Sequence, residues 1–67
     1  MNQSEVLDVV RTHGPIRSKD ISEILGCDDV INVRKKLKML RTWGLVEPFK
    51  AKNKDGRTEI LYRAVEL

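Results

Sequence analysis

The spacing of apolar side chains predicts that the chain begins with a helix over residues 4–12. In this segment the apolar residues recur every three or four positions and share one helix face, while the charged residues share the opposite face. The apolar face consists of Val6, Leu7 and Val10. Asn2 has the character of an N-cap, and Gly14 followed by Pro15 favours a stop, because proline cannot extend a helix.

A second, shorter helix is predicted from Ser18 up to Gly26. Ser18 offers a hydroxyl as N-cap, and Asp20 lies in the first turn, where a negative charge is favourable. The apolar stripe of this helix consists of Ile21, Ile24 and Leu25. Gly26 ends the helix, and Cys27 then occupies a tight turn before the next segment.

The third helix is predicted over residues 29–43, with Asp28 or Asp29 as its N-cap. Its core-facing stripe, at spacings of three and four, consists of Val30, Val33, Leu37 and Leu40. Because a helix turns by about 100° per residue, the opposite face carries mainly polar and basic side chains. The outward positions are Ile31, Lys35, Lys38 and Thr42, with Arg34 on one flank and Asn32 and Met39 on the other.

Two strands are predicted after Gly44, at residues 45–50 and 58–64. In the second strand, the side chains at positions 60, 62 and 64 are expected to face away from those at 61 and 63. Between the strands, Asp55 is followed by Gly56, a dipeptide typical of hairpin turns. The C-terminal third is therefore expected to form a β-hairpin.

The order of these elements predicts an α+β fold of three helices followed by a C-terminal two-stranded β-hairpin. Ile16, in the short segment between the first two helices, favours a short third strand beside the hairpin. The chain has 67 residues, which is close to the smallest size at which a core forms without covalent help. We therefore expect a single domain over residues 1–67, without internal repeats or linkers.

Charge is distributed unevenly along the chain, although the net charge is only +3. Residues 1–33 carry a balance of −3, residues 34–57 a balance of +7, and the remaining residues a balance of −1. The basic segment covers most of the third helix and the hairpin loop. Such a cluster is typical of a protein that binds a polyanion, although a solvated helix face can also be rich in lysine.

The composition argues against several classes of function. Cys27 is the only cysteine and His13 the only histidine, so the sequence lacks the converging ligands of a usual metal site. No glycine-rich phosphate loop or nucleophile motif is present, so we expect neither an enzyme nor a cofactor. The apolar runs are too short to cross a membrane, and without a secretory leader or a second cysteine the sequence favours a cytoplasmic protein.

Three stretches of the sequence resemble the winged helix-turn-helix proteins. They are Gly14-Pro15-Ile16, Ile21 to Gly26, and Leu37 to Glu47. Together they look like the pattern of small bacterial and archaeal transcriptional regulators of the MarR and ArsR type. The resemblance implies a DNA-binding winged helix, acting as a small regulator of a prokaryote or one of its viruses. The turn before the third helix departs from the family, because it is about one residue longer and holds Asp28 and Asp29 where the family often has serine or threonine.

The third helix and the hairpin supply the expected contacts to double-stranded DNA. An α-helix about 10–12 Å across fits the major groove, where basic, amide and apolar side chains read base edges. The expected contacts on this helix are Ile31, Asn32, Arg34, Lys35 and Lys38. The wing of the family commonly reaches the backbone or the minor groove, so the resemblance adds Lys52, Lys54 and Arg57. Ser18 and Lys19, at the start of the second helix, favour a further phosphate contact.

Other functions fit parts of the pattern. A winged-helix protein-interaction module in a larger nucleic-acid-processing assembly would expose apolar side chains at Met39, Trp43 and Phe49, although Trp43 is expected instead to close the core under the wing. Ile31 is either a base contact or a half-buried residue. Binding of RNA or of single strands is disfavoured, because aligned aromatic residues for base stacking are missing. A weak homodimer through the first helix is an alternative to a monomer.

Overall fold

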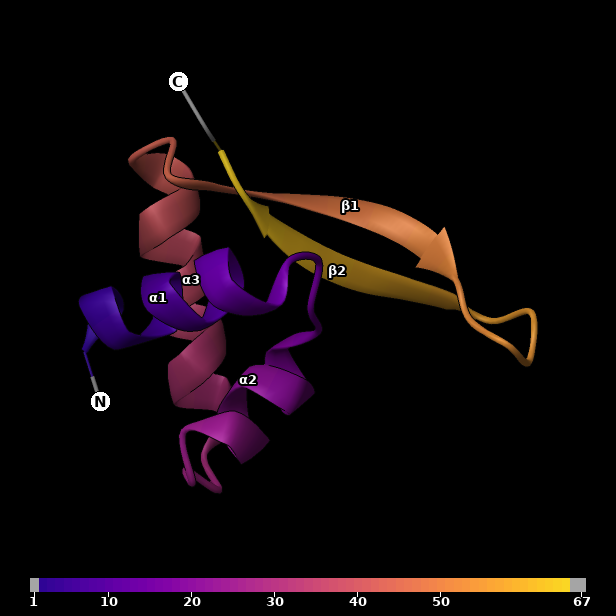
Figure 1. The fold of residues 1–67 in the computed structure, drawn as a ribbon, viewed down its shortest axis with the longest axis horizontal. Helices are drawn as coiled ribbons and strands as arrows, with labels where there is room; N and C mark the ends of the chain where they lie inside the picture. The colour runs from indigo at the N-terminus through magenta and orange to yellow at the C-terminus, as the bar shows by residue number, and fades with distance from the viewer. Residues whose placement is uncertain (1, 66–67) are drawn as a thin grey trace.

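The computed structural model describes residues 2–65, which form three helices followed by one antiparallel hairpin. The helices are α1 (Gln3–His13), α2 (Ser18–Ile24) and α3 (Val30–Thr42), and the strands are β1 (Val46–Lys52) and β2 (Thr58–Ala64) (Figure 1). This order confirms the predicted α+β class and has the layout of a winged helix. The bounds of β2 are those predicted, whereas β1 ends two residues later than expected.

Side-chain caps fix the start of α1 and of α3, as predicted. The Asn2 Oδ1 atom accepts a hydrogen bond of 3.0 Å from the Glu5 N–H, and the Asp29 Oδ1 atom accepts one of 3.1 Å from the Asn32 N–H. These bonds satisfy backbone N–H groups that have no partner within the helix. At the other end of α1, Gly14 has a φ of 71°, a conformation that glycine adopts readily because it lacks Cβ.

The predicted cap of α2 by Ser18 is wrong. Arg17 holds the N-cap position in an extended conformation without a side-chain cap, and Ser18 is already the first helical residue. The reason is tertiary, because Ile16 pairs with Tyr62 of β2 and the backbone stays extended through Arg17. The Ser18 Oγ atom instead accepts a hydrogen bond of 3.5 Å from the Nε of Arg34.

The short third strand expected near Ile16 is present as a single residue pair. The N–H of Ile16 donates to the Tyr62 carbonyl at 3.0 Å, and the N–H of Tyr62 donates to the Ile16 carbonyl at 2.9 Å. This bridge joins the segment between α1 and α2 to β2. It therefore ties the base of the hairpin to the helices.

A short turn closes the hairpin, in which residues 46–52 pair with residues 58–64. The Asn53 N–H donates to the Arg57 carbonyl at 2.9 Å, and the Gly56 N–H donates to the Asn53 carbonyl at 3.0 Å. Gly56 has a φ of 78°, the left-handed conformation that this kind of three-residue loop requires. The turn predicted at the Asp-Gly dipeptide is therefore confirmed.

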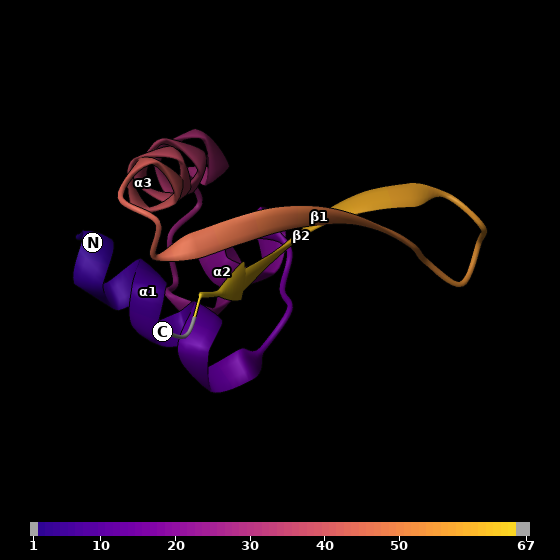
Figure 2. The ribbon, with the colours of Figure 1, turned by 90° about the horizontal axis from the view of Figure 1, so that it is seen from above.

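The core lies where the three helices meet the base of the hairpin. The large side chains with almost no exposed area are Val6, Val10, Ile21, Val33, Leu37, Leu40 and Val46. Tyr62 and Ala64, at the base of β2, pack against this cluster. Beyond its base the hairpin projects away from the helices, as Figures 1 and 2 show. The distal half of the hairpin therefore does not pack against the core.

One expectation about a large apolar side chain is wrong, and one open alternative is excluded. Trp43, expected to close the core under the hairpin, is 57% exposed at the C-cap of α3. The reason is that the chain turns at Gly44, so that Leu45 and Val46 cover the core at this end of α3 instead. Ile31 is 65% exposed, which excludes the half-buried alternative for this residue.

Candidate nucleic-acid interface

One flank of α3 carries three basic side chains, which we call the basic row. Arg34, Lys38 and Arg41 recur at spacings of four and three, so they lie one above another along the helix. All three are exposed. Hydrogen bonds show which neighbour each flank of α3 faces. Arg34 donates to Ser18 of α2, whereas Met39 on the opposite flank accepts a hydrogen bond from α1. The basic row therefore lies on the side of α3 that faces α2 and the hairpin.

The hairpin turns one of its faces toward the basic row. Side chains alternate between the two faces of a strand, so the register places Lys50 and Lys52 on the same face as Ile60 and Tyr62. We call this the inner face. Ile60 and Tyr62 line a cleft together with Arg34, which orients the inner face toward α3. Lys50 lies directly opposite Ile60 on this face, Lys52 lies further out, and both are exposed.

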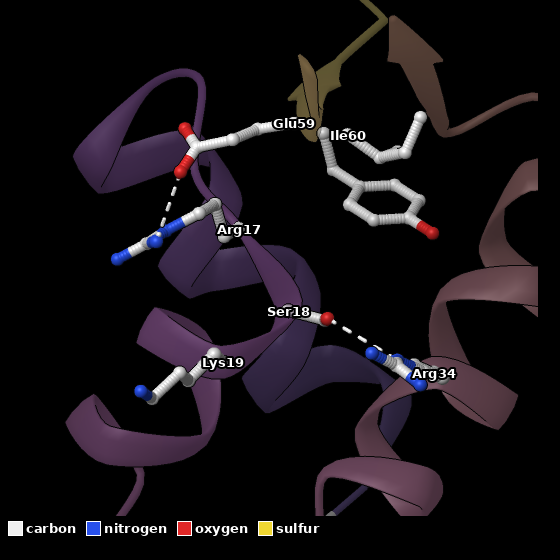
Figure 3. A pocket seen from close by; sticks show the side chains of 7 residues that line it. Arg17, Ser18, Lys19, Arg34, Glu59 and Ile60 are labelled. Atoms are coloured by element: carbon white, nitrogen blue, oxygen red, sulfur yellow. Dashed lines mark hydrogen bonds and ion pairs between the residues drawn. The ribbon is translucent and has the colours of Figure 1, made fainter. Parts of the chain in front are cut away.

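The cleft between α2, α3 and β2 has a volume of about 370 Å³. Its lining residues are Arg17, Ser18, Lys19, Arg34, Glu59, Ile60 and Tyr62. Figure 3 shows Ser18 and Arg34 pointing toward each other across the gap between α2 and α3, while Lys19 points away from Arg34. Two of the residues predicted to contact DNA, Ser18 and Arg34, are thus brought together at the base of the hairpin.

Arg17 lines the same cleft, but its charge is already neutralised by two carboxylates. Its Nε and Nη2 atoms donate to the two carboxylate oxygens of Asp20 at 2.9 and 3.0 Å, and its Nη1 atom donates to Glu59 of β2 at 3.0 Å. The hydrogen bond from Arg17 lowers the pKa of Asp20, and the bond to Asp20 raises the pKa of Arg17. Arg17 is therefore engaged within the protein.

We expect the pair of Arg17 and Asp20 to make stability depend on pH in acid. The folded protein holds the pKa of Asp20 below its ordinary value of 3.8, so the pair stabilises the fold above that pH, and the stabilisation is lost as the pH falls through the lower folded pKa. Asp20→Asn should lower the midpoint of thermal unfolding slightly at about pH 7 and leave it unchanged at about pH 2. Thermal unfolding followed by circular dichroism checks this. An equal difference at both pH values would contradict the assignment.

Lys54 and Arg57 lie in the hairpin loop, at the end of the hairpin farthest from the helices (Figures 1 and 2). Both side chains are exposed. Asn53 braces this loop, because its Oδ1 atom accepts hydrogen bonds from the N–H groups of Asp55 and Arg57 at 2.9 and 3.0 Å. Its Nδ2 atom donates to Glu59 at 3.2 Å. Lys54 and Arg57 therefore extend from a loop whose backbone is held by hydrogen bonds.

The remaining predicted residues of α3 divide between its outer surface and its far flank. Ile31 and Lys35 lie opposite the buried stripe, and both are exposed. Asn32 is also exposed, but it lies on the flank of Met39, away from the hairpin. The predicted helix residues therefore do not form one compact group.

Sequence reasoning overlooks two basic residues of the candidate site. They are Arg41 of the basic row and Lys50 of the inner face. The signal for Arg41 is its spacing of seven residues from Arg34, which returns the chain to the same helix flank. The signal for Lys50 is its spacing of two residues from Lys52 on β1, which places both on one face. These spacings alone do not show which flank of α3 lies toward the hairpin. They also do not show which face of the hairpin lies toward α3.

The acidic residues before α3 lie at the opposite end of this helix from the hairpin. Asp28 and Asp29 are both exposed, and Asp29 caps the helix. The hairpin follows the other end of α3, after its 13 residues. The pair therefore lies at the N-terminal end of α3, between one and two helical turns from Arg34, and not at the end from which the hairpin starts.

The polar groups that the described residues expose at the cleft are mainly hydrogen-bond donors. Guanidinium, ammonium and hydroxyl groups bind anions such as phosphate. Within residues 2–65, no three or more histidine, cysteine, aspartate or glutamate side chains converge in a way that suits a metal ion. No helix of the same segment is long and apolar enough to cross a membrane.

No protein-family model and no curated protein matches this chain. Geometry and charge are therefore the properties of the molecule that point to a function. The most distinctive feature is the basic row of α3 beside the inner face of the hairpin, with Ser18 between them at the start of α2.

Proposed function

We propose that this chain is a winged helix-turn-helix domain that binds double-stranded DNA, as a small transcriptional regulator does. The observation that carries the proposal is the position of the basic row of α3 beside the inner face of the hairpin. Arg34 of the row and Tyr62 of the inner face line one cleft, and Lys50 and Lys52 continue the inner face outward. The helix α3 and the hairpin thus both carry cations on the sides that face each other.

The outer surface of α3 suits the major groove of DNA. A helix is about 10–12 Å across, and the groove is about 12 Å wide. Arg34 is the strongest candidate for a base contact, because its planar guanidinium forms two parallel hydrogen bonds with guanine. The exposed Ile31 side chain suits a thymine methyl group, and Asn32 offers an amide for adenine from the other flank. Lys35 and Lys38 supply contacts to phosphates or to guanine edges.

The hairpin and the start of α2 are assigned to the DNA backbone. Lys50 and Lys52 supply cations on the inner face of the hairpin, Lys54 and Arg57 supply them in its loop, and Ser18 and Lys19 add donors in the cleft beside Arg34. Phosphate contacts of this kind fix the position of a protein on the duplex without reading sequence. The proposed binding site is therefore a composite, in which α3 reads bases and the hairpin holds the backbone.

Fluorescence anisotropy with a labelled duplex of mixed sequence tests this proposal. We expect binding with a dissociation constant on the order of 10⁻⁶ M at low salt, even without a specific site, because several phosphates are contacted. A single strand of the same sequence is expected to bind more weakly. The proposal would be overturned by the absence of duplex binding or by a clear preference for the single strand.

A second candidate function is a protein-interaction module, and one observation favours it. Met39 and Trp43 are 42% and 57% exposed and lie one turn apart on the flank of α3 that faces away from the hairpin. Phe49 is only partly exposed, and Arg63 stacks over its ring with 5.0 Å from the guanidinium carbon to the ring centroid, so this ring is less available to a partner. The candidate surface is therefore limited to two side chains, which is small for a stable interface.

Trp43 provides an intrinsic probe that separates the two functions. Because its side chain is exposed and lies away from the basic row, we expect the emission spectrum of a water-exposed indole, unchanged at saturating duplex. Fluorescence titration with DNA measures this directly. A shift of the Trp43 emission to shorter wavelength on adding DNA would contradict the proposed orientation. A shift caused by a protein partner and not by DNA would favour the interaction module.

A further inference from the structure

We propose that a relay of side chains from α2 to the hairpin loop holds the hairpin at a fixed angle to α3. The relay consists of Asp20, Arg17, Glu59 and Asn53. This inference deepens the proposed function, on which its DNA-binding consequence rests, by identifying positioning residues that need not contact DNA themselves. Its structural part can be tested without DNA.

The first half of the relay fixes a guanidinium on the surface of the helical body. Two hydrogen bonds to Asp20 hold Arg17 at the start of α2. Because a bidentate pair already restricts this side chain, its third bond, to Glu59, costs little additional conformational entropy. Arg17 and Glu59 are 42 residues apart in sequence, so this bond joins the helices to β2.

The second half of the relay continues from β2 into the loop. Glu59 Oε1 accepts from Arg17 at 3.0 Å and from the Asn53 Nδ2 atom at 3.2 Å, so one carboxylate oxygen joins both halves. The side-chain oxygen of Asn53 in turn accepts hydrogen bonds from the backbone N–H groups of Asp55 and Arg57. Hydrogen bonds of three side chains, Arg17, Glu59 and Asn53, thus connect the helical body to the backbone of the hairpin loop.

The distal hairpin needs such a connection, because its other attachments lie at its base. The bridge between Ile16 and Tyr62 and the packing of Ala64 hold only the part next to the core. Further out, Lys50, Lys52 and Ile60 are exposed, and a two-stranded hairpin without packing on one face is only marginally stable. Without the relay, the outer hairpin is expected to swing and twist about its base.

A fixed angle matters for binding a rigid duplex with two elements. When α3 occupies the groove, the inner face can contact the backbone only over a narrow range of orientations. Ordering a mobile hairpin during binding would cost conformational entropy, which a preset angle avoids. The relay also pairs two carboxylates beside the basic cleft with Arg17, which reduces their repulsion of phosphates.

Two substitutions of Glu59 separate hydrogen bonding from charge. Glu59→Gln keeps an oxygen that accepts from both Arg17 and Asn53, whereas Glu59→Met has a similar length and no hydrogen-bond acceptor of comparable strength. Both variants lose the same negative charge, so any difference between them reports the relay. Arg17→Gln breaks the relay from the other side and serves as a second test if Glu59→Met folds poorly.

Energy transfer from Trp43, the only tryptophan, to an acceptor on the hairpin loop measures the distance between α3 and the loop. The width of the distance distribution reports how firmly the hairpin is held. The acceptor is attached to a cysteine placed by Lys54→Cys, in a background with Cys27→Ser. Time-resolved transfer should give the same narrow distance distribution for the parent and for Glu59→Gln, and a broader one for Glu59→Met and for Arg17→Gln. Distributions for these last two variants as narrow as that of the parent would overturn the proposal.

Duplex binding by the unlabelled variants tests the consequence of the relay. Glu59→Met should bind about tenfold more weakly than Glu59→Gln at about 0.1 M salt, with a log-log salt slope shallower by about 1, because one fewer phosphate is neutralised. Equal affinities and slopes in spite of a broadened distance distribution would overturn the role of the relay in DNA binding. If the parent chain binds no duplex, the proposed function fails, and energy transfer still decides whether the relay fixes the hairpin.

Discussion

Lys38→Glu is expected to weaken duplex binding by about 100-fold at 0.1 M salt, while the protein stays folded. Lys38 is exposed at the centre of the basic row, between Arg34 and Arg41. Loss of one phosphate contact reduces affinity by about tenfold at this salt concentration, because fewer counterions are released. A carboxylate in its place adds repulsion of similar size. The measurement is an anisotropy titration, with circular dichroism to verify folding.

Lys36→Glu is the matched control for this prediction. It makes the same change of charge on the same helix, but it lies on the flank of α3 away from the hairpin and is partly buried. We expect a decrease in affinity of only a few-fold, caused by the change in overall charge. Equal losses for the two variants would show that net charge, and not the basic row, governs binding.

Leu37→Ala is expected to leave the domain largely unfolded at 37 °C. Leu37 is completely buried in the core, and truncation of such a leucine costs about 3–5 kcal/mol, including the cavity that remains. A domain of this size has a stability of only about 3–5 kcal/mol, so the substitution removes most of it. Urea unfolding followed by circular dichroism measures the loss.

Ile31→Ala is the control for this second prediction. It also truncates a large aliphatic side chain of α3, but Ile31 is 65% exposed, so the change in unfolding free energy should be within about 0.5 kcal/mol. The same variant is expected to bind DNA less tightly if Ile31 contacts a base. A midpoint for Leu37→Ala close to that of Ile31→Ala would refute the description of the core.

The helices and the hairpin could be predicted because local chemistry determines them. The caps at Asn2 and Asp29 and the turn at Gly56 require only neighbouring residues, and each was found as expected. The errors occurred where tertiary contacts decide. Ser18 lies inside α2 because Ile16 pairs with a strand more than forty residues away, and Trp43 is exposed because residues that follow it cover the core.

The candidate site could be predicted only in part, for the same reason. Lys38 and Arg34 were identified from the outward face of one helix, which periodicity defines. Arg41 and Lys50 join the same surface only because the flank of Arg34 lies toward the inner face of the hairpin. The relay from Arg17 to Glu59 depends on the hairpin register and on the path of the chain into α2, so no local pattern indicates it.

The salt dependence of duplex binding tests the central claim most directly. If α3 and the hairpin together neutralise five or six phosphates, the logarithm of the association constant falls linearly with the logarithm of the salt concentration, with a slope of about −4 to −6. Anisotropy titrations over a range of salt concentrations give this slope. A slope close to zero, or no binding to the duplex at low salt, would contradict a composite DNA-binding surface.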